Sequence, residues 1–106
     1  MKLQDKVAIV TAAGRGIGKG IAEALAAQGA RLVLNSYSPD TTAAVLEAVR
    51  AKGVAAVALP GDITDPDQML ELRDLALDEF GQIDILVNNV GAGPKTAAAP
   101  QAQELG

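Results

Sequence analysis

Residues 11–18 read Thr11-Ala12-Ala13-Gly14-Arg15-Gly16-Ile17-Gly18, and they join an apolar run at residues 6–11 to a helical pattern that begins at Ile17. Glycines at such a junction allow the backbone to turn tightly and to approach a ligand closely. The following helix directs its free N–H groups and the positive end of its dipole at the same place. The sequence therefore predicts a strand–loop–helix unit that binds a phosphate or pyrophosphate. The alternative is a glycine turn that only permits close packing of helix and strand.

The same alternation continues along the chain. Apolar runs at residues 31–35, 54–59 and 83–88 are separated by helical patterns that begin at Ser38-Pro39 and Asp65-Pro66. Runs that are apolar nearly throughout are typical of parallel strands covered on both faces. We predict an α/β fold, a doubly wound parallel sheet of the Rossmann type with strand order 3-2-1-4. Ligand is expected at the carboxyl ends of the first and fourth strands.

The pattern fades after Gly91, which divides the chain. We expect residues 1–91 to form the dinucleotide-binding Rossmann portion, truncated after its fourth strand, and residues 92–106 to form a loop or disordered tail. The first two helices should cover one face of the sheet and the third helix the other. The fourth strand would then be an open apolar edge. We therefore expect a homo-oligomer that associates through this edge or through the exposed face.

Composition excludes several classes of function. The chain has 106 residues, a net charge of −4, and neither cysteine nor histidine. Disulfides and thiolate metal sites are therefore excluded, and no metal site is predicted. An acidic chain is not drawn to nucleic acid or anionic membranes by its overall field. The sequence has no signal peptide and no apolar run long enough to cross a membrane. We therefore expect a cytoplasmic protein that binds neither nucleic acid nor a membrane.

Three motifs together resemble the short-chain dehydrogenase/reductase family. Thr11, followed after four residues by Gly16-Ile17-Gly18, matches its Thr-Gly-x-x-x-Gly-Ile-Gly loop, whereas the common Gly-x-Gly-x-x-Gly pattern does not fit. Asn88-Asn89-Val90-Gly91 is similar to the family's Asn-Asn-Ala-Gly, and Asp62-Ile63 to its Asp-Val. Ala12 replaces a glycine, which is a small change if φ is negative there. Val90 replaces an alanine and adds bulk beside the binding crevice.

The resemblance implies a role for each matched residue. Gly14, Gly16, Ile17 and Gly18 would hold a pyrophosphate, and Asn89 to Gly91 would line the ribose beside the nicotinamide. Asp62 would accept a hydrogen bond from adenine, although taken alone it favours a turn or capping carboxylate. Asn88 would bond across the central strands, and Asp84 would be structural. The full predicted cofactor-binding set is Thr11, Gly14, Arg15, Gly16, Ile17, Gly18, Ser36, Tyr37, Asp62, Ile63, Asn89, Val90 and Gly91.

The end of the second strand bears on the choice of cofactor. It reads Asn35-Ser36-Tyr37-Ser38 and carries no acid. An acid there commonly binds the ribose 2′-hydroxyl of NAD, and it would repel a 2′-phosphate. Arg15 resembles the basic residue of members that use NADP and can pair with that phosphate, while the hydroxyls of residues 36–38 can donate to it. We predict NADP(H) rather than NAD(H). The alternative for Arg15 is a solvated surface charge.

Family members transfer hydride between nicotinamide and a carbonyl or alcohol carbon, using a tyrosine with a lysine four residues on. A nearby ammonium brings the phenol's pKa toward the working range. The only tyrosine here is Tyr37, and the residue four positions on is Thr41. No catalytic residue is therefore predicted, and the 106-residue chain alone is expected to be inactive.

Two functions remain open. The first is the cofactor-binding N-terminal part of an NADP(H)-dependent oxidoreductase that reduces a small carbonyl substrate, bound only in a longer form. Arg15, the acid-free second strand and the opening residues 2–7 make the 3-oxoacyl-acyl-carrier-protein reductases the most similar subgroup. The second is a non-catalytic nucleotide-binding or interaction module that self-associates through its open sheet.

Overall fold

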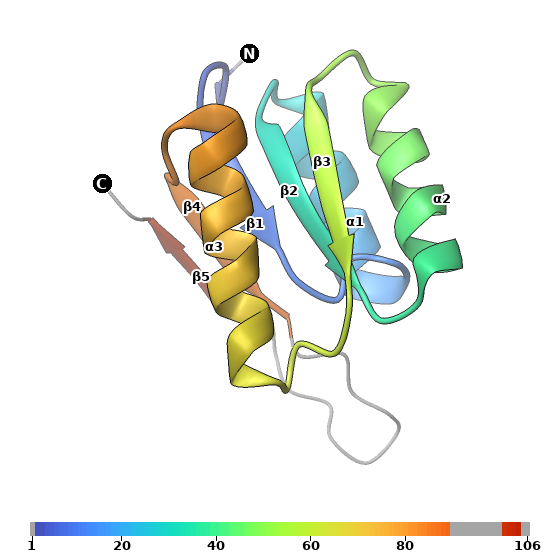
Figure 1. Ribbon diagram of the computed structural model, residues 1–106. Coiled ribbons are helices and arrows are strands. Elements are labelled where there is room, and N and C mark those ends of the chain that lie inside the picture. Colours follow the sequence, from blue (N-terminus) through green and yellow to red (C-terminus); the bar gives the residue numbers. More distant parts are fainter. Residues whose placement is uncertain (1, 90–100, 105–106) are drawn as a thin grey trace.

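The computed structural model describes residues 2–89 and 101–104. Figure 1 shows a single sheet with helices on both of its faces. The elements in chain order are β1 (Val7–Val10), α1 (Gly16–Ala27), β2 (Arg31–Ser36), α2 (Pro39–Arg50), β3 (Ala56–Pro60), α3 (Pro66–Phe80), β4 (Ile85–Asn88) and β5 (Gln101–Glu104). The strand order is β3-β2-β1-β4-β5, and the first four strands pair in parallel. The predicted Rossmann-type order 3-2-1-4 is confirmed.

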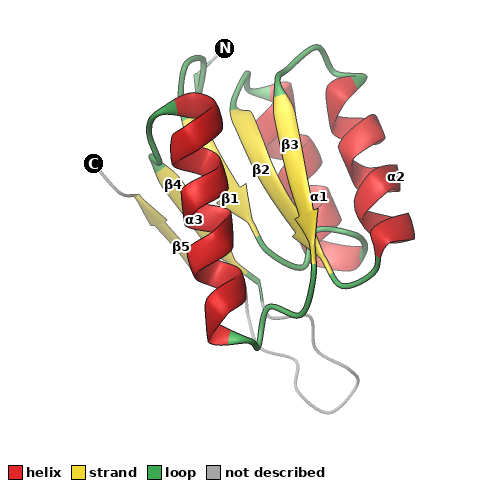
Figure 2. Cartoon of the chain, viewed as in Figure 1, coloured by secondary structure: helices red, strands yellow, loops and turns green. Residues whose placement is uncertain are grey.

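The two faces of the sheet have separate cores. Helices α1 and α2 pack on one face, where Ala22, Ala26, Val45 and Val49 are buried against alternate residues of the strands. Helix α3 packs on the opposite face through Leu72 and Ala76 (Figure 2). All four residues of β1 are buried, which explains why this strand is apolar throughout. The core therefore centres on β1 and positions its carboxyl end.

Local sequence signals set the starts of α2 and α3. Ser38 caps α2 by accepting from the backbone N–H of Thr41, and Pro39 occupies the first turn. Asp65 caps α3 in the same way from Asp67, and Gly81 ends that helix in the left-handed conformation. The predicted starts of these two helices are confirmed.

Helix α1 packs differently from what the apolar spacing suggests. Its buried residues are Gly18, Ala22 and Ala26, four apart, whereas Ile17 is 64% exposed. The contact face is therefore made of small side chains, which lets the helix lie close to the sheet. Ile17 is left at the carboxyl edge, facing solvent.

The far edge of the sheet corrects two expectations. Residues 101–104, expected in a loop or disordered tail, form β5, which pairs antiparallel with β4 in the register Ile85 to Glu104 through Asn88 to Gln101. The fourth strand is therefore not an open edge, and it is not the strand at which the sheet ends. The error arose because no apolar run marks β5, whose residues are Gln-Ala-Gln-Glu. An antiparallel partner needs backbone N–H and C=O groups but no buried apolar side chains.

Asp84 joins the amino ends of β1 and β4. Its Oδ2 accepts from the backbone N–H of Val7 (2.8 Å) and from the Gln82 amide (2.7 Å). The Val7 bond is the main reason why the pKa of Asp84 lies below its usual range. This arrangement agrees with the structural role implied for Asp84. It lies at the opposite end of the strands from the candidate site.

Candidate cofactor site

Thr11 ties the glycine loop to the chain that follows β4. Its side chain is fully buried, and its Oγ1 accepts from the backbone N–H of Asn89 (2.9 Å) and lies 3.0 Å from the Asn89 carbonyl. The Asn89 amide in turn donates to the Ala12 carbonyl (3.4 Å). Asn88 is exposed and lies 3.3 Å from the same hydroxyl. The structure thus brings Thr11 and Asn89 together, with Asn89 making more of the cross-strand bonds than Asn88.

The three glycines of the loop have different roles. A Cβ at Gly18 would overlap the Ala12 carbonyl and lie 2.6 Å from the Asn89 amide nitrogen, and a Cβ at Gly14 would overlap the Ser36 hydroxyl. These two positions need glycine because other groups approach closely. Gly16 has a φ of +61°, and no described residue lies within 4 Å of a Cβ built there, so glycine is needed for the turn and not for close packing. The alternative explanation, that the glycines only permit close packing, therefore applies to Gly14 and Gly18 but not to Gly16.

The N-terminus of α1 has the properties of an anion site. Its N-cap residue, Arg15, is extended and makes no side-chain capping bond, and the first turn holds no acidic residue. In contrast, the first turns of α2 and α3 are capped by Ser38 and Asp65. The first N–H groups of a helix have no partner within the helix, and at α1 an oxygen ligand would satisfy them.

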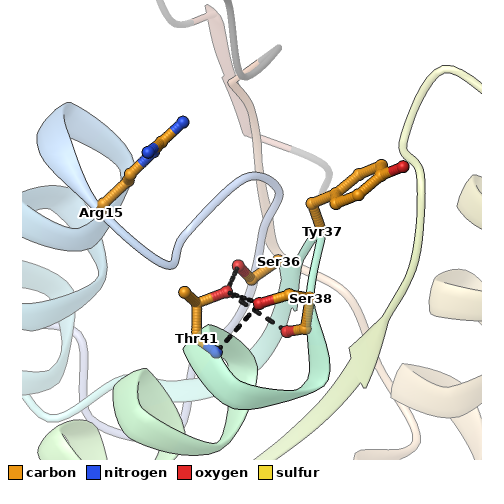
Figure 3. Close-up of a pocket in the computed structure, with 5 residues that line it drawn as sticks. All are labelled: Arg15, Ser36, Tyr37, Ser38 and Thr41. Carbon is orange, nitrogen blue, oxygen red and sulfur yellow. Dashed lines mark hydrogen bonds between the residues drawn. The ribbon is translucent and has the colours of Figure 1, made fainter.

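A pocket of about 220 Å³ lies beside this terminus, lined by Arg15, Ser36, Tyr37, Ser38 and Thr41. Figure 3 shows the three short hydroxyl side chains facing one another, with Arg15 and Tyr37 on either side. Thr41 Oγ1 is the centre of this cluster, at 2.6 Å from Ser36 Oγ and 2.9 Å from Ser38 Oγ. Sequence reasoning missed Thr41, although its position three residues after an N-cap serine marks it as a neighbour of that serine.

The pocket combines positive charge with hydroxyl groups. Arg15 is exposed, as the alternative interpretation of a solvated charge requires, and it is also one of the five residues that line the pocket (Figure 3). Tyr37 is 78% exposed, so its ring forms a wall rather than part of the core. Ser36 is buried and its hydroxyl is directed at Thr41. The predicted residues Arg15, Ser36 and Tyr37 are thus brought together at the end of β2.

Asn35 is a second residue that sequence reasoning missed. It is 1% exposed, and its Oδ1 accepts from the backbone N–H of Ala12 (3.0 Å). Its Nδ2 donates to the carbonyls of Leu59 (3.3 Å) and Gly61 (3.1 Å). One amide therefore links the loops that follow β1 and β3. A buried polar residue ending an apolar run was the available signal.

Asp62 follows Gly61 on the exposed surface. Its Oδ1 accepts from the backbone N–H of Thr64 (2.9 Å) and from the Thr64 hydroxyl (2.6 Å). These bonds lower the pKa of Asp62, the hydroxyl bond having the larger effect. Asp62 thus acts as a turn-capping carboxylate in this structure, while adenine binding by Asp62 and Ile63 stays a prediction. Ile63 is partly buried and packs against the core beneath α3.

Other predictions meet the limits of the described residues. Val90 and Gly91 lie outside them, so their predicted contacts stay predictions. Within residues 2–89 and 101–104, no cluster of three or more carboxylates has the arrangement of a metal site. In the same part of the chain, every helix is too short or too polar to cross a membrane.

The glycine loop also corrects the expectation for Ala12. Its φ is +49°, not negative, so this alanine occupies the left-handed region that a glycine would adopt freely. The replacement of the family's glycine is therefore not a neutral change. The loop keeps its turn despite the added Cβ.

Comparisons with known proteins agree with this geometry. The family profile described as "short chain dehydrogenase" matches residues 6–105. Elsinochrome reductase 1 of Elsinoe fawcettii is 45% identical over 91 residues, which are 85% of this chain and 34% of the relative. The chain thus spans about a third of that relative's length.

Two solved structures have the same fold. A short-chain dehydrogenase from Mycobacterium paratuberculosis bound to NAD aligns with a TM-score of 0.81 at 30% identity, covering 88% of this chain and 39% of that one. L-Sorbose reductase from Gluconobacter frateurii, complexed with NADPH and L-sorbose, aligns with a TM-score of 0.81 at 33% identity, covering 88% and 36%. These relatives include proteins with either nicotinamide cofactor and do not single out the 3-oxoacyl reductases. The loop motifs, the sheet order and the profile match establish that the chain belongs to the short-chain dehydrogenase family, a family of oxidoreductases with a nucleotide-binding Rossmann fold.

Proposed function

We propose that this chain binds NADP(H) in preference to NAD(H), as the cofactor-binding part of an oxidoreductase that reduces a carbonyl compound, of which a 3-oxoacyl thioester is one candidate. The observation that supports the cofactor preference is the pocket at the end of β2. Among the residues that the structure describes, Arg15 and the hydroxyls of Ser36, Ser38 and Thr41 line it, and no carboxylate does. A dianionic 2′-phosphate fits such a lining, whereas a ribose 2′-hydroxyl gains little from an arginine.

The cofactor would extend along the carboxyl edge of the sheet. The pyrophosphate is assigned to the uncapped N-terminus of α1 beside Gly16 and Ile17. Adenine is assigned to the side of Asp62 and Ile63, and the nicotinamide ribose to the segment that begins at Asn89. The neighbouring positions of these loops at the ends of β1, β3 and β4 support the assignment. Bound cofactor would supply the hydride, while these residues orient it.

Reduction of a carbonyl also needs a group that donates a proton, and the resemblance implies a tyrosine with a lysine four residues on. The chain has one tyrosine, Tyr37, at the β2 end of the site and followed four residues on by Thr41. We therefore propose that these 106 residues bind cofactor without turning over a carbonyl substrate. Mixing the chain with NADPH and a panel of ketones and 3-oxoacyl thioesters, and following absorbance at the nicotinamide band, tests this. Steady oxidation of NADPH that requires the ketone would refute it.

Arg15 gives the sharpest test of the cofactor preference. We expect Arg15→Gln to weaken NADP⁺ binding by about tenfold to a hundredfold, the worth of a hydrogen bond to a charged group. Binding of NAD⁺ should change by less than about threefold, because it has no 2′-phosphate. Isothermal titration of both cofactors measures this.

Lys19→Gln is the matched control. Lys19 is an exposed cation one helical turn beyond Arg15, and it does not line the pocket. The Lys19→Gln substitution should change the affinities for NAD⁺ and NADP⁺ only weakly and to the same degree. If Arg15→Gln weakened NAD⁺ and NADP⁺ binding to the same degree, Arg15 would act only through the general field, and the preference for NADP(H) would lose its support.

A further inference from the structure

Ala12 is held by its two flanking peptide groups, and both are bonded to the same residue. The N–H of Ala12 donates to the side-chain Oδ1 of Asn35 (3.0 Å). The next N–H, of Ala13, donates to the backbone carbonyl of Asn35 (2.6 Å). The φ and ψ of a residue are the rotations between its two flanking peptide planes. A residue that fixes both planes therefore fixes the conformation of Ala12.

The Asn35 side chain has only one orientation that satisfies its partners. Its Nδ2 faces two carbonyls, those of Leu59 and Gly61. Turning the amide over would place its oxygen against both carbonyls and its nitrogen against the Ala12 N–H. The loop after β3 thereby aims Oδ1 at Ala12. Because Asn35 is 1% exposed, water does not compete for these bonds.

The conformation that results is one an alanine does not favour. The φ of +49° lies in the left-handed region, where a Cβ is crowded by the neighbouring backbone. The Ala12 carbonyl is also packed against Gly18, at the place where a Cβ would be. If Ala12 relaxed to a negative φ, this carbonyl and the start of α1 would have to move.

We infer that Asn35 is a positioning residue for cofactor binding: it holds Ala12 in the left-handed conformation and so keeps the glycine loop in its binding shape before the cofactor arrives. The dependence arises because this chain has alanine at position 12, and glycine would adopt the same φ without help. The expected effect on cofactor affinity rests on the proposed function. The conformation of Ala12, in contrast, can be measured without any nucleotide.

A double-mutant cycle on the 106-residue chain tests this. With Ala12 present, Asn35→Ala should weaken NADPH binding by about tenfold or more; in an A12G background the same substitution should weaken it by about threefold or less. Fluorescence titration with NADPH gives the four affinities. Equal losses in both backgrounds would overturn the inference, because Asn35 would then act on the fold and not on Ala12.

A second measurement is independent of cofactor. In the free chain, the backbone chemical shifts of residue 12 should report left-handed geometry in the wild type and lose it in Asn35→Ala, together with faster hydrogen exchange of the Ala12 amide. Retention of both signals in Asn35→Ala would contradict the inference. If the wild type showed these signals but bound no NADPH, the proposed function would fail, while the finding that Asn35 holds Ala12 in the left-handed conformation would stand.

Two further variants test whether a loss of NADPH affinity comes only from a less stable fold. Asp84→Ala removes a bond to the buried Val7 N–H at the opposite end of the sheet, so it should lower thermal stability and leave NADPH affinity within about twofold. If Asn35→Ala does not fold, Asn35→Ser enters the cycle in its place and keeps a hydroxyl. Loss of NADPH affinity in Asp84→Ala equal to that in the Asn35 variant would overturn the specific role.

Discussion

Ala12 is the residue at which a local preference and the tertiary structure disagree. A left-handed φ costs an alanine about 1–2 kcal/mol, whereas glycine loses more backbone freedom on folding by about 0.4–1 kcal/mol. We therefore expect Ala12→Gly to raise the free energy of unfolding by up to about 1.5 kcal/mol. Ala24→Gly, the same change at an exposed position inside α1, should lower it by about 1 kcal/mol. Urea denaturation of both variants measures this, and a shared negative sign would show that Ala12 is not strained.

Asp84 gives a prediction of pH dependence at the same scale. Its folded pKa is lowered from 3.8, chiefly by the bond from the Val7 N–H, so the unfolded chain takes up a proton more readily than the folded one. The carboxylate thus stabilises the fold above that value, and its contribution is lost as pH falls through the folded pKa. We expect the stability difference between wild type and Asp84→Asn to be constant near about pH 7 and to shrink below about pH 4. Denaturation curves at several pH values measure it; a difference that does not change with pH would contradict this account.

At the scale of the element, two glycines of α1 predict opposite effects of one substitution. Gly20→Ala meets no atom of the described residues within 4 Å and adds a better helix former, so it should stabilise the fold by about 1 kcal/mol. Gly18→Ala places a methyl group against the Ala12 carbonyl and the Asn89 amide, so it should destabilise the fold by about 1–3 kcal/mol and weaken cofactor binding. Thermal melts with and without NADPH compare the pair. Equal stabilisation by both would mean that α1 lies farther from the loop than described.

At the scale of the whole molecule, the core thins away from β1. Ile85 and Leu86 of β4 are only partly buried, and Leu70 and Leu77 on α3 are 48% and 46% exposed and seven residues apart, on one side of that helix. Because β5 pairs with β4, we expect self-association to use this α3 face instead of the β4 edge. Light scattering over a dilution series should show dimers or larger species that dissociate in Leu70→Ser/Leu77→Ser.

Ile17→Ser is the matched control for that experiment. Ile17 is 64% exposed but lies on α1, on the opposite face of the sheet from α3. It should leave the scattering unchanged. A wild-type chain that remains monomeric at all tested concentrations would remove the reason for a homo-oligomer.

The sequence alone determined the parts of this protein that depend on local patterns. Apolar runs, the helical pattern from Ile17 and the helix starts at Ser38 and Asp65 predicted the first four strands, the three helices and the order of the strands. The predicted strand order placed the glycine loop and the segment after the fourth strand at the same edge of the sheet, and the bond between Asn89 and Thr11 joins these two segments there. Such features are readable because each depends on a few neighbouring residues.

Only the tertiary structure decided the features that depend on residues far apart in the chain. The left-handed φ of Ala12 is set by Asn35, 23 positions away, and β5 is defined by its backbone pairing with β4. Hydrogen bonds and close contacts between distant segments leave no period or local preference in the sequence, and for that physical reason they could not be predicted from it.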